Sequence, residues 1–453
     1  MIVVGINAYH GDSSACVLRD GVLVAAAEEE RFRRIKHWAG FPSEAIRYCL
    51  QEAGVGLGEV DHFAINRDPK ANLLKKLGFT LAKRPDLKFV LDRLRNAKEV
   101  ATIEEELERA FPGEKVRGTV HHIEHHLAHL ASAFLVSPFD EAVAVSVDGF
   151  GDFASAAWGV GRGSVIEVED KVYFPHSLGI FYQALTQYIG FPHYGDEYKV
   201  MGLAPYGQPH FMAEMQKIVL LRDDGSFRLS LEYFRHANEK IESEWNNGAP
   251  TVGRLFTPAL ETLLGPSRQP DDPLTQHHKD IARSIQVMYE KAFFHLLNAL
   301  HRRHRMPALA LAGGCAMNSV ANGKIYVNTP FTQVYIQSAA GDAGGAIGAA
   351  FETWHRVSGA PRNFIMDHAY WGPEASDEEI EMLLAARRAE LEQQGCKVER
   401  LNDLDALCER AAQSISEGKV VGWGIHAIVI YGLLYLAIRF LMPLDGMRRV
   451  QSS

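Results

Sequence analysis

Short apolar runs separated by polar turns open the chain. Residues 2–6, 15–18 and 22–27 are rich in Val, Ile, Leu and Ala, and the polar segments between them predict strand, loop, strand, tight turn, strand. A later apolar run, 142–147, predicts another strand. Longer stretches with helical periodicity, such as 281–304, separate the groups of strands. The pattern therefore predicts an α/β fold.

The order of these elements recurs along the chain. Strand–hairpin–strand units followed by helices occur once in about residues 1–170 and again in about 171–355, with a Lys-, Arg- and Glu-rich helical insertion at about 68–115. We expect two related α/β halves around a cleft, where ligands of such folds usually bind at the ends of strands. Three acidic residues at predicted strand ends would face that cleft: Asp12, Asp148 and Asp342.

The segment 121–152 carries the clearest chemistry. His121, His125 and His129 are spaced by four, so on one helix they share a face. Two imidazoles one turn apart form a half-site for a metal ion, and Asp148 at the end of the next strand could close it. A histidine-rich polar face is the alternative, because such spacing arises by chance in a chain with 20 histidines.

Other polar segments give weaker signals. Residues 313–324 (GGCAMNSVANGK) and 338–350 (SAAGDAGGAIGAA) are glycine-rich turns from strand to helix, where backbone N–H groups favour phosphate, although tight packing is the alternative for each. The loop 10–14 clusters acceptors and hydroxyls, yet such loops are more often plain hairpins. The mixed-charge segment 28–36 predicts a solvated helix start.

Composition narrows the class of protein. A chain of 453 residues with 47% hydrophobic and 23% charged residues is ordinary for a globular protein of two or three domains. The net charge of −9 argues against a nucleic-acid binder, which should be basic. Five scattered cysteines without CxxC spacing indicate neither a disulfide framework nor a structural zinc site. We expect a cytoplasmic protein, because the N-terminus resembles a first strand and not a signal peptide.

Taken together, several segments resemble the O-carbamoyltransferases of antibiotic and nodulation-factor biosynthesis. The resemblance covers about residues 1–420, and its motifs are specific as a set although each is weak alone. In chain order they are HGDSSACVL, EERFRRIKH, HHLAHLASAF, SVDGFGD, HSLGIFYQALTQYIGF, GDEYKVMGLAPYG, GGCAMNS and GDAGGAIGAA.

The resemblance implies a fold and a set of site residues. The fold is a duplicated α/β domain of the ASKHA type (actin, sugar kinase and Hsp70), with two halves around a nucleotide cleft over residues 1–355. The family's divalent metal, for which Fe(II) is favoured and Mn, Zn or Mg are alternatives, would be held by His125, His129, Asp148 and Asp342. The family's N-terminal His-Asp loop corresponds to the catalytic candidates His10 and Asp12, with His10 contacting or deprotonating the acceptor hydroxyl. The nucleotide would be lined by Gly313, Gly314, Asn318, Gly344 and Gly345.

The implied reaction has two parts. A C-terminal YrdC-like domain condenses carbamoyl phosphate with ATP to carbamoyl-adenylate, and the ASKHA domain passes the carbamoyl group to an alcohol and releases AMP. The expected partners are thus an adenine nucleotide and a small-molecule hydroxyl acceptor such as a sugar, an antibiotic or a nodulation factor. Neither a nucleic acid nor a membrane is expected, and a homodimer is one option for the assembly.

The chain departs from the family pattern after residues 414–423. The expected Phe-Gly-Pro-Arg-Ala-Leu-Gly type of segment is replaced by an apolar tail at 425–442, which predicts an incomplete C-terminal YrdC-like α/β domain over 356–453. A truncated or frameshifted gene, a natural short variant and a tail anchor are the competing explanations. Two other functions stay open at this point: a metal-dependent ATP phosphotransferase or hydrolase of the same fold, and a catalytically incomplete nucleotide-binding remnant.

Overall fold

The computed structural model describes most of the chain and divides it into two compact units, Met1–Trp371 and Gly372–Ser453. Each unit is treated by itself. The apolar tail 425–442 and the middle of the predicted insertion lie outside the described residues, which are 1–83, 102–239, 241, 243–244, 248–401 and 403–422.

The first sheet of unit 1 is built from the N-terminal strands. Its order is β3-β2-β1-β4-β5, with β1–β2 and β2–β3 antiparallel and β1–β4 and β4–β5 parallel. Strands β1, β2 and β4 are buried over nearly their whole length, as expected for strands covered on both faces. The bounds are β1 (Ile2–Asn7), β2 (Ser14–Arg19), β3 (Val22–Glu28), β4 (His62–Ile65) and β5 (Thr119–His122).

The second sheet repeats this design with later strands. Its order is β14-β13-β6-β7-β8, so that three antiparallel strands are again continued by two parallel ones. The repeated order confirms the prediction of a duplicated ASKHA-type α/β domain. The bounds are β6 (Glu141–Gly151), β7 (Ala154–Arg162), β8 (Val165–Tyr173), β13 (Ala308–Ala312) and β14 (Gln333–Ile336).

The division between the halves differs from the one predicted near residue 170. Strands β6, β7 and β8 lie before that point, yet β6 pairs with β13 through Val143, Ala144 and Val145 and so belongs to the second sheet. The predicted histidine helix also begins later than expected. His121 lies in β5 beside Ala64 of β4, and the helix starts at His125, where the Glu124 side chain accepts a hydrogen bond from the N–H of Leu127.

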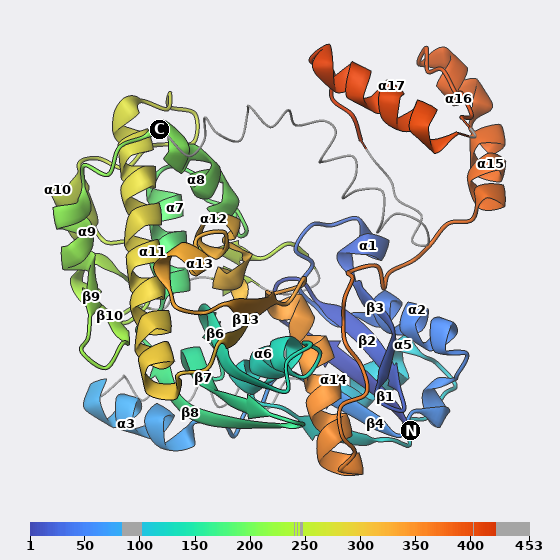
Figure 1. The fold of residues 1–453 in the computed structure, drawn as a ribbon, viewed down its shortest axis with the longest axis horizontal. Coiled ribbons are helices and arrows are strands. Elements are labelled where there is room, and N and C mark those ends of the chain that lie inside the picture. Colours follow the sequence, from blue (N-terminus) through green and yellow to red (C-terminus); the bar gives the residue numbers. More distant parts are fainter. Residues whose placement is uncertain (84–101, 240, 242, 245–247, 402, 423–453) are drawn as a thin grey trace. The chain divides into compact units, whose positions relative to one another are not determined.

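Two helices separate the sheets (Figure 1). Helix α6 (His125–Phe134) packs on β6 and β13, whereas α14 (Asp342–Ser358) packs on β1 and β2, and the two helices pack on each other. Their closest approach needs small residues, because a Cβ at Gly348 would collide with the carbonyl oxygen of Ala128. The Gly/Ala composition of α14 is thus explained by helix packing in the middle of the molecule.

The outer faces carry the remaining helices. Helix α2 packs its buried residues against the first sheet. Helices α7 and α11 contribute to a large apolar core beside the second sheet. In the described part of the chain, no helix has both the length and the apolar character that a membrane span requires. The other elements of unit 1 are α1 (Glu30–Arg33), α2 (Ser43–Ala53), η1 (Leu57–Glu59), α3 (Leu73–Lys83), α5 (Ile103–Ala110), α7 (Leu178–Tyr188), α8 (Glu197–Leu203), η2 (Ala204–Tyr206), α9 (Met212–Ile218), β9 (Val219–Leu221), β10 (Phe227–Leu229), η3 (Leu231–Tyr233), β11 (Ser243–Glu244), β12 (Thr251–Val252), α10 (Pro258–Leu264), α11 (Gln276–His304), η4 (Gly314–Met317), α12 (Ser319–Asn322) and α13 (Ile325–Asn328).

The second unit begins later than the predicted boundary at residue 355. The connecting segment stays with unit 1, because the N–H of Met366 donates to the carbonyl of Val136 and the N–H of Ala26 donates to the carbonyl of Trp371. The described residues of unit 2 contain α15 (Asp377–Ala386), α16 (Arg388–Gln393) and α17 (Leu404–Ser416). No strand lies among these described residues, so the predicted YrdC-like α/β character stays a prediction.

Candidate functional site

The first turns of α6 bring two imidazoles together. His125 and His129 are both buried, and their Nε2 atoms lie 3.1 Å apart. This is the convergence expected for an i, i+4 pair on one helix face. His126 faces another way: its Nδ1 lies 3.0 Å from the hydroxyl of Ser146. The structure therefore separates the paired histidines from their neighbour, as the helical spacing predicted.

Two carboxylates complete the group. Asp148 Oδ2 lies 3.2 Å from His125 Nε2 and 3.0 Å from His129 Nε2. Asp342, the first residue of α14, places Oδ1 at 3.5 and 3.4 Å from the same two nitrogens. One ligand atom from each of the four residues lies within 4.8 Å of the others. The predicted set of two imidazoles and two carboxylates therefore comes together in space.

The strand that carries Asp148 is interrupted where the carboxylate leaves it. The ladder between β6 and β7 loses its register between Val147 and Gly151. The prediction that the strand ends at Asp148 is thus correct for its pairing, although β6 itself continues to Gly151. The N–H groups of Gly149 and Gly314 donate to Asp148 Oδ1 at 2.7 and 3.1 Å, which leaves Oδ2 directed at the imidazoles.

Protonation follows from this packing. Burial disfavours the charged form of His129, but its hydrogen bonds with Asp148 and Asp342 outweigh burial and raise its pKa to about 10. The pKa of His125 is raised in the same way. Burial alone would raise the pKa of Asp148, yet the two imidazoles hold it well below the usual range. By contrast, burial lowers the pKa of His126 to about 4, so this histidine stays neutral.

The donor set fits a divalent cation. Two imidazole nitrogens converge on the same carboxylate oxygen, an arrangement that needs either protons or a cation between the groups. Nitrogen and carboxylate ligands suit first-row divalent metals, and these atoms do not select one of them. The residues that would hold such an ion are His125, His129, Asp148 and Asp342.

The predicted catalytic residues His10 and Asp12 lie near the His/Asp group but contact different partners. His10 Nδ1 is 3.8 Å from Asp342 Oδ2, and its ring is 5.6 Å from that of His125. Asp12 turns away from His10 and pairs with His37, whose Nδ1 lies 2.7 Å from Asp12 Oδ1. The backbone of Asp12 is left-handed, with φ of +61°, a conformation that costs energy for a residue other than glycine.

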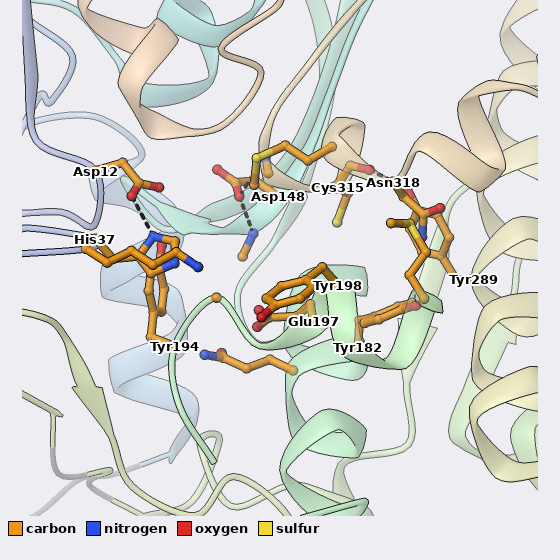
Figure 2. Close-up of a pocket in the computed structure, with 18 residues that line it drawn as sticks. Asp12, His37, Asp148, Tyr182, Tyr194, Glu197, Tyr198, Tyr289, Cys315 and Asn318 are labelled. Carbon is orange, nitrogen blue, oxygen red and sulfur yellow. Dashed lines mark hydrogen bonds and ion pairs between the residues drawn. The ribbon is translucent and has the colours of Figure 1, made fainter. Parts of the chain in front are cut away.

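A cavity of about 340 Å³ opens next to the His/Asp group. Figure 2 shows Asp12 and His37 at one end, Cys315 and Asn318 at the other, and Asp148 between them. Aromatic and thioether side chains supply most of its apolar wall: Tyr182, Tyr194, Tyr198, Tyr289, Met201 and Met317. His10 is not among the lining residues. The two ends of the cavity thus differ in chemistry: one carries the Asp12–His37 pair and the other the amide of Asn318.

The predicted nucleotide-binding residues divide into two groups. Gly314 and Asn318 line the cavity. Gly313, with φ of +89°, packs against the carbonyl of Val147, and Gly344 and Gly345 are buried in α14, where added side chains would meet Ala339 and Asn66. Tight packing, the alternative interpretation of these turns, therefore explains the three glycines that do not line the cavity.

Sequence reasoning missed the partner of Asp12. His37 follows the mixed-charge segment 28–36, which predicted only a solvated helix start, and the structure forms just one turn there, α1. The N–H of His37 donates to Glu30 Oε2 at 2.8 Å, and its ring contacts that of Tyr194 edge-on. Nothing in the spacing of Asp12 and His37 along the chain reveals the contact, because a loop and two strands separate them.

A duplicated α/β domain with a His/Asp group beside a ligand-sized cavity has the features of a small-ligand-binding domain. Comparison with known proteins then gives the family. A family model described as carbamoyltransferase N-terminus matches residues 2–351. The chain belongs to this carbamoyltransferase family.

Sequence relatives match this chain more closely than the solved structures do. An uncharacterized protein of Synechocystis sp. is 38% identical over 93% of this chain and 68% of its own length. Nodulation protein NolNO of Sinorhizobium fredii is 34% identical over 92% of this chain and 56% of its own length. The ROK hexokinase of Thermus thermophilus matches 80% of this chain and 100% of its own at 12% identity, with a TM-score of 0.37, too low to add to the sheet order.

Proposed function

We propose that unit 1 is the acceptor-transfer domain of an O-carbamoyltransferase, which moves a carbamoyl group from carbamoyl-adenylate to a hydroxyl of a small molecule. One observation carries the proposal: a cavity lined by Asp148 of the His/Asp group has chemically different residues at its two ends. A transfer reaction needs two ligands that meet at one point. Membership of the carbamoyltransferase family suggests that the transferred group is a carbamoyl group, and we place the donor and the acceptor in this one cavity.

We assign the adenylate to the end that holds Gly314 and Asn318. The side chain of Asn318 is fixed by a pair of 3.0 Å hydrogen bonds with Gln286, and Gln286 also accepts from the hydroxyl of Tyr182 at 2.8 Å. Groups held in this way are preorganised for a polar ligand and lose little entropy on binding. The rings of Tyr182 and Tyr289 offer apolar surface to a flat base.

We assign the acceptor to the opposite end. His37 occupies one carboxylate oxygen of Asp12, and the other oxygen has no hydrogen bond to any described residue. A carboxylate held by an imidazole on one side can accept a hydroxyl proton on the other. Asp12 is therefore the better candidate base, and His10, which lies outside the cavity lining, is placed to orient Asp342.

The transfer balances with these groups. The acceptor oxygen bonds to the carbamoyl carbon, the bond from that carbon to the phosphate oxygen breaks, and AMP leaves while the hydroxyl proton passes to Asp12. A divalent cation bound by the His/Asp group would supply Lewis-acid stabilisation of negative charge on oxygen. The N–H groups of Gly149 and Gly314 keep the Asp148 carboxylate in place throughout.

The test supplies preformed carbamoyl-adenylate and a panel of sugars to the full chain loaded with Fe(II) or Mn²⁺. We expect AMP and a carbamoylated sugar in equal amounts. Release of AMP at the same rate with and without every sugar would contradict acceptor transfer. Formation of ADP from ATP alone would instead favour the phosphotransferase or hydrolase alternative, and tight nucleotide binding without any product would favour the remnant.

Formation of carbamoyl-adenylate is a separate proposal. The chain spans 56% of the length of NolNO, and the resemblance assigns the step that consumes carbamoyl phosphate and ATP to a C-terminal YrdC-like domain. Supplying carbamoyl phosphate and ATP in place of preformed carbamoyl-adenylate tests whether this chain carries that step, and release of pyrophosphate would show that it does.

A further inference from the structure

The hairpin turn between β6 and β7 has an unusual backbone. Its two turn residues, Asp152 and Phe153, both have positive φ angles, +47° and +74°. Two-residue hairpins of this type strongly prefer Asn-Gly or Asp-Gly, because glycine adopts such angles without strain. A phenylalanine in this conformation is strained. The contacts made by the two side chains explain why the turn tolerates this strain.

Asp152 joins two segments that are far apart in the sequence. Its Oδ2 accepts hydrogen bonds from the backbone N–H of His125 at 3.0 Å and from that of Asp68 at 2.8 Å. Its backbone carbonyl accepts a further bond of 2.8 Å from the Asn72 side chain. One carboxylate oxygen therefore links the first residue of α6 to the segment that leads into α3.

The residue before the turn supports the ring of His125. Any Cβ at Gly151 would collide with that imidazole, so the ring lies directly on the glycine backbone. The position of the turn thus fixes both the main chain and the side chain of His125.

Phe153 holds α3 against the same turn. Its ring centroid lies 5.8 Å from that of Phe79 in α3 and 5.3 Å from that of Phe174, and Phe79 also contacts Phe174 edge-on at 5.1 Å. Aromatic pairs in such geometry stabilise a contact beyond the apolar area that they bury. The segment 68–79 is therefore anchored to the turn by hydrogen bonds at one end and by aromatic contacts at the other.

We propose that Asp152 is a positioning residue that couples the order of segment 68–79 to the metal-ligating geometry of His125. This coupling rests on the metal centre of the proposed function but goes beyond it. Occupation of the centre fixes His125, which fixes the turn and orders the segment; by linkage, loosening the segment weakens cation binding by the same factor. A ligand that contacts 68–79 would thereby be sensed at the metal centre.

The test measures cation affinity and segment order in the full chain, without donor or acceptor. Absorption titration with Co²⁺ reports coordination by the His/Asp group, and hydrogen exchange reports the amides of 68–79 with and without the ion. We expect Co²⁺ to slow exchange at 68–79. Asp152→Ala should abolish that protection and weaken Co²⁺ binding about tenfold, in the range found when a group that orients a ligand is removed. Asp152→Asn, which keeps an acceptor oxygen, should restore part of both.

Asp68→Asn is the matched control, because it retains both the backbone N–H that Asp152 binds and a side-chain oxygen that can accept from the N–H of Lys70. It should bind Co²⁺ like the wild type. If Asp152→Ala does not fold, Asn72→Ala carries the test, since it loosens the segment without touching His125; it should speed exchange at 68–79 and weaken Co²⁺ binding.

Equal Co²⁺ affinity in Asp152→Ala and Asp68→Asn, or exchange at 68–79 that does not change when the ion binds, would overturn the coupling while leaving the metal centre intact. A wild-type chain that binds neither Co²⁺ nor Mn²⁺ would remove the metal centre and the coupling with it.

Discussion

The two sheets of unit 1 follow the same order, yet they contribute different chemistry to the site. In each half the first hairpin and the helix after the fifth strand reach the centre of the molecule. The first half supplies His10 and Asp12 from its hairpin and paired imidazoles from α6. The second half supplies Asp148 from its hairpin and Asp342 from α14.

The comparison shows how a duplicated fold makes an asymmetric site. Helix α6 presents residues from two successive turns, whereas α14 presents only its first residue, because its interior is small and packed on its partner helix. A carboxylate at a helix N-terminus is also stabilised by the helix dipole. Nitrogen ligands thus come from one half and oxygen ligands from the other, so the site forms only when α6 and α14 are in contact.

The largest expected effect comes from separating these two helices. Gly348→Val places a branched side chain against the carbonyl oxygen of Ala128, and neither backbone can yield. We expect a loss of more than about 4 kcal/mol in the free energy of unfolding, which is exceptional for one substitution. Chemical denaturation followed by circular dichroism measures it. Gly78→Ala in the exposed part of α3 meets nothing within 4 Å and should leave stability unchanged or slightly raised; equal effects from the two variants would contradict the helix contact.

The next effect tests the nitrogen half of the site. His129→Ala removes one of two converging imidazoles, and we expect Mn²⁺ or Co²⁺ affinity to fall at least about 100-fold, beyond the cost of losing a group that only orients a ligand. His126→Asn is the matched control: it alters a buried histidine on the same helix that bonds to Ser146 instead. Calorimetric titration compares the two. A similar loss of affinity in both variants would show that α6 folding, and not ligation, was measured.

How much of this site the sequence predicts depends on the distance over which its parts interact. The imidazole pair follows from helical spacing within one turn, and the strand before Asp148 follows from its apolar run. The element pattern placed Asp342 at the cleft, but its membership of the ligand set came only from the family resemblance, because α14 lies far along the chain. The sheet order also could not be read locally: β6 continues the first apolar strands in sequence but pairs with β13 in space.

The errors have equally local causes. His121 has the correct spacing for the histidine helix, but the parallel pairing of β5 with β4 requires extended backbone there, and Glu124 then caps the helix. Spacing rules carry no information about where a helix begins. Gly344 and Gly345 are buried in α14, where glycine serves helix packing, and their contact with a nucleotide stays a prediction. Asp152 is the last residue of the motif SVDGFGD, but its hydrogen bonds to the N–H groups of His125 and Asp68 can be seen only in the folded structure.

A smaller effect tests the acceptor end of the cavity. Asp12→Asn keeps the shape of the side chain but cannot accept a proton, and we expect kcat for carbamoyl transfer to fall about 100-fold, the lower range for loss of a general base. Mn²⁺ affinity at the His/Asp group should stay at the wild-type value, because Asp12 is not one of its four residues and lies instead with Glu30 and His37 in a separate cluster. Single-turnover kinetics with preformed adenylate measures the rate.

His10→Gln separates the two candidate bases in the same assay. If His10 and not Asp12 is the base, its rate will fall more than that of Asp12→Asn. His37→Gln should lower the rate less than Asp12→Asn and shift its pH dependence, because the bond to Asp12 raises the pKa of His37.

The smallest effect contrasts two histidines on one helix, His126 and His129, in metal-free protein. The pKa of His129 is raised to about 10, so the stability from its ion pairs is fully present below pH 6.5 and is lost as pH rises through 10. The pKa of His126 is lowered to about 4, so its contribution is present above pH 6.5 and is lost as pH falls toward 4. We expect the Tm to fall by a few degrees on each side, at about 2–4 °C per kcal/mol lost.

Saturating Mn²⁺ should affect the fall in Tm at high pH, which comes from His129, but not the fall at low pH, which comes from His126. A bound cation requires neutral imidazoles, so it replaces the proton of His129 and should remove the alkaline fall in Tm, while the acid limb from His126 stays. For the same reason Mn²⁺ affinity should increase with pH between 6.5 and 10. Scanning calorimetry across pH, with chelator or with Mn²⁺, measures both. An alkaline limb that persists unchanged with Mn²⁺ would mean that the proton lost there is not shared between His129 and the two carboxylates.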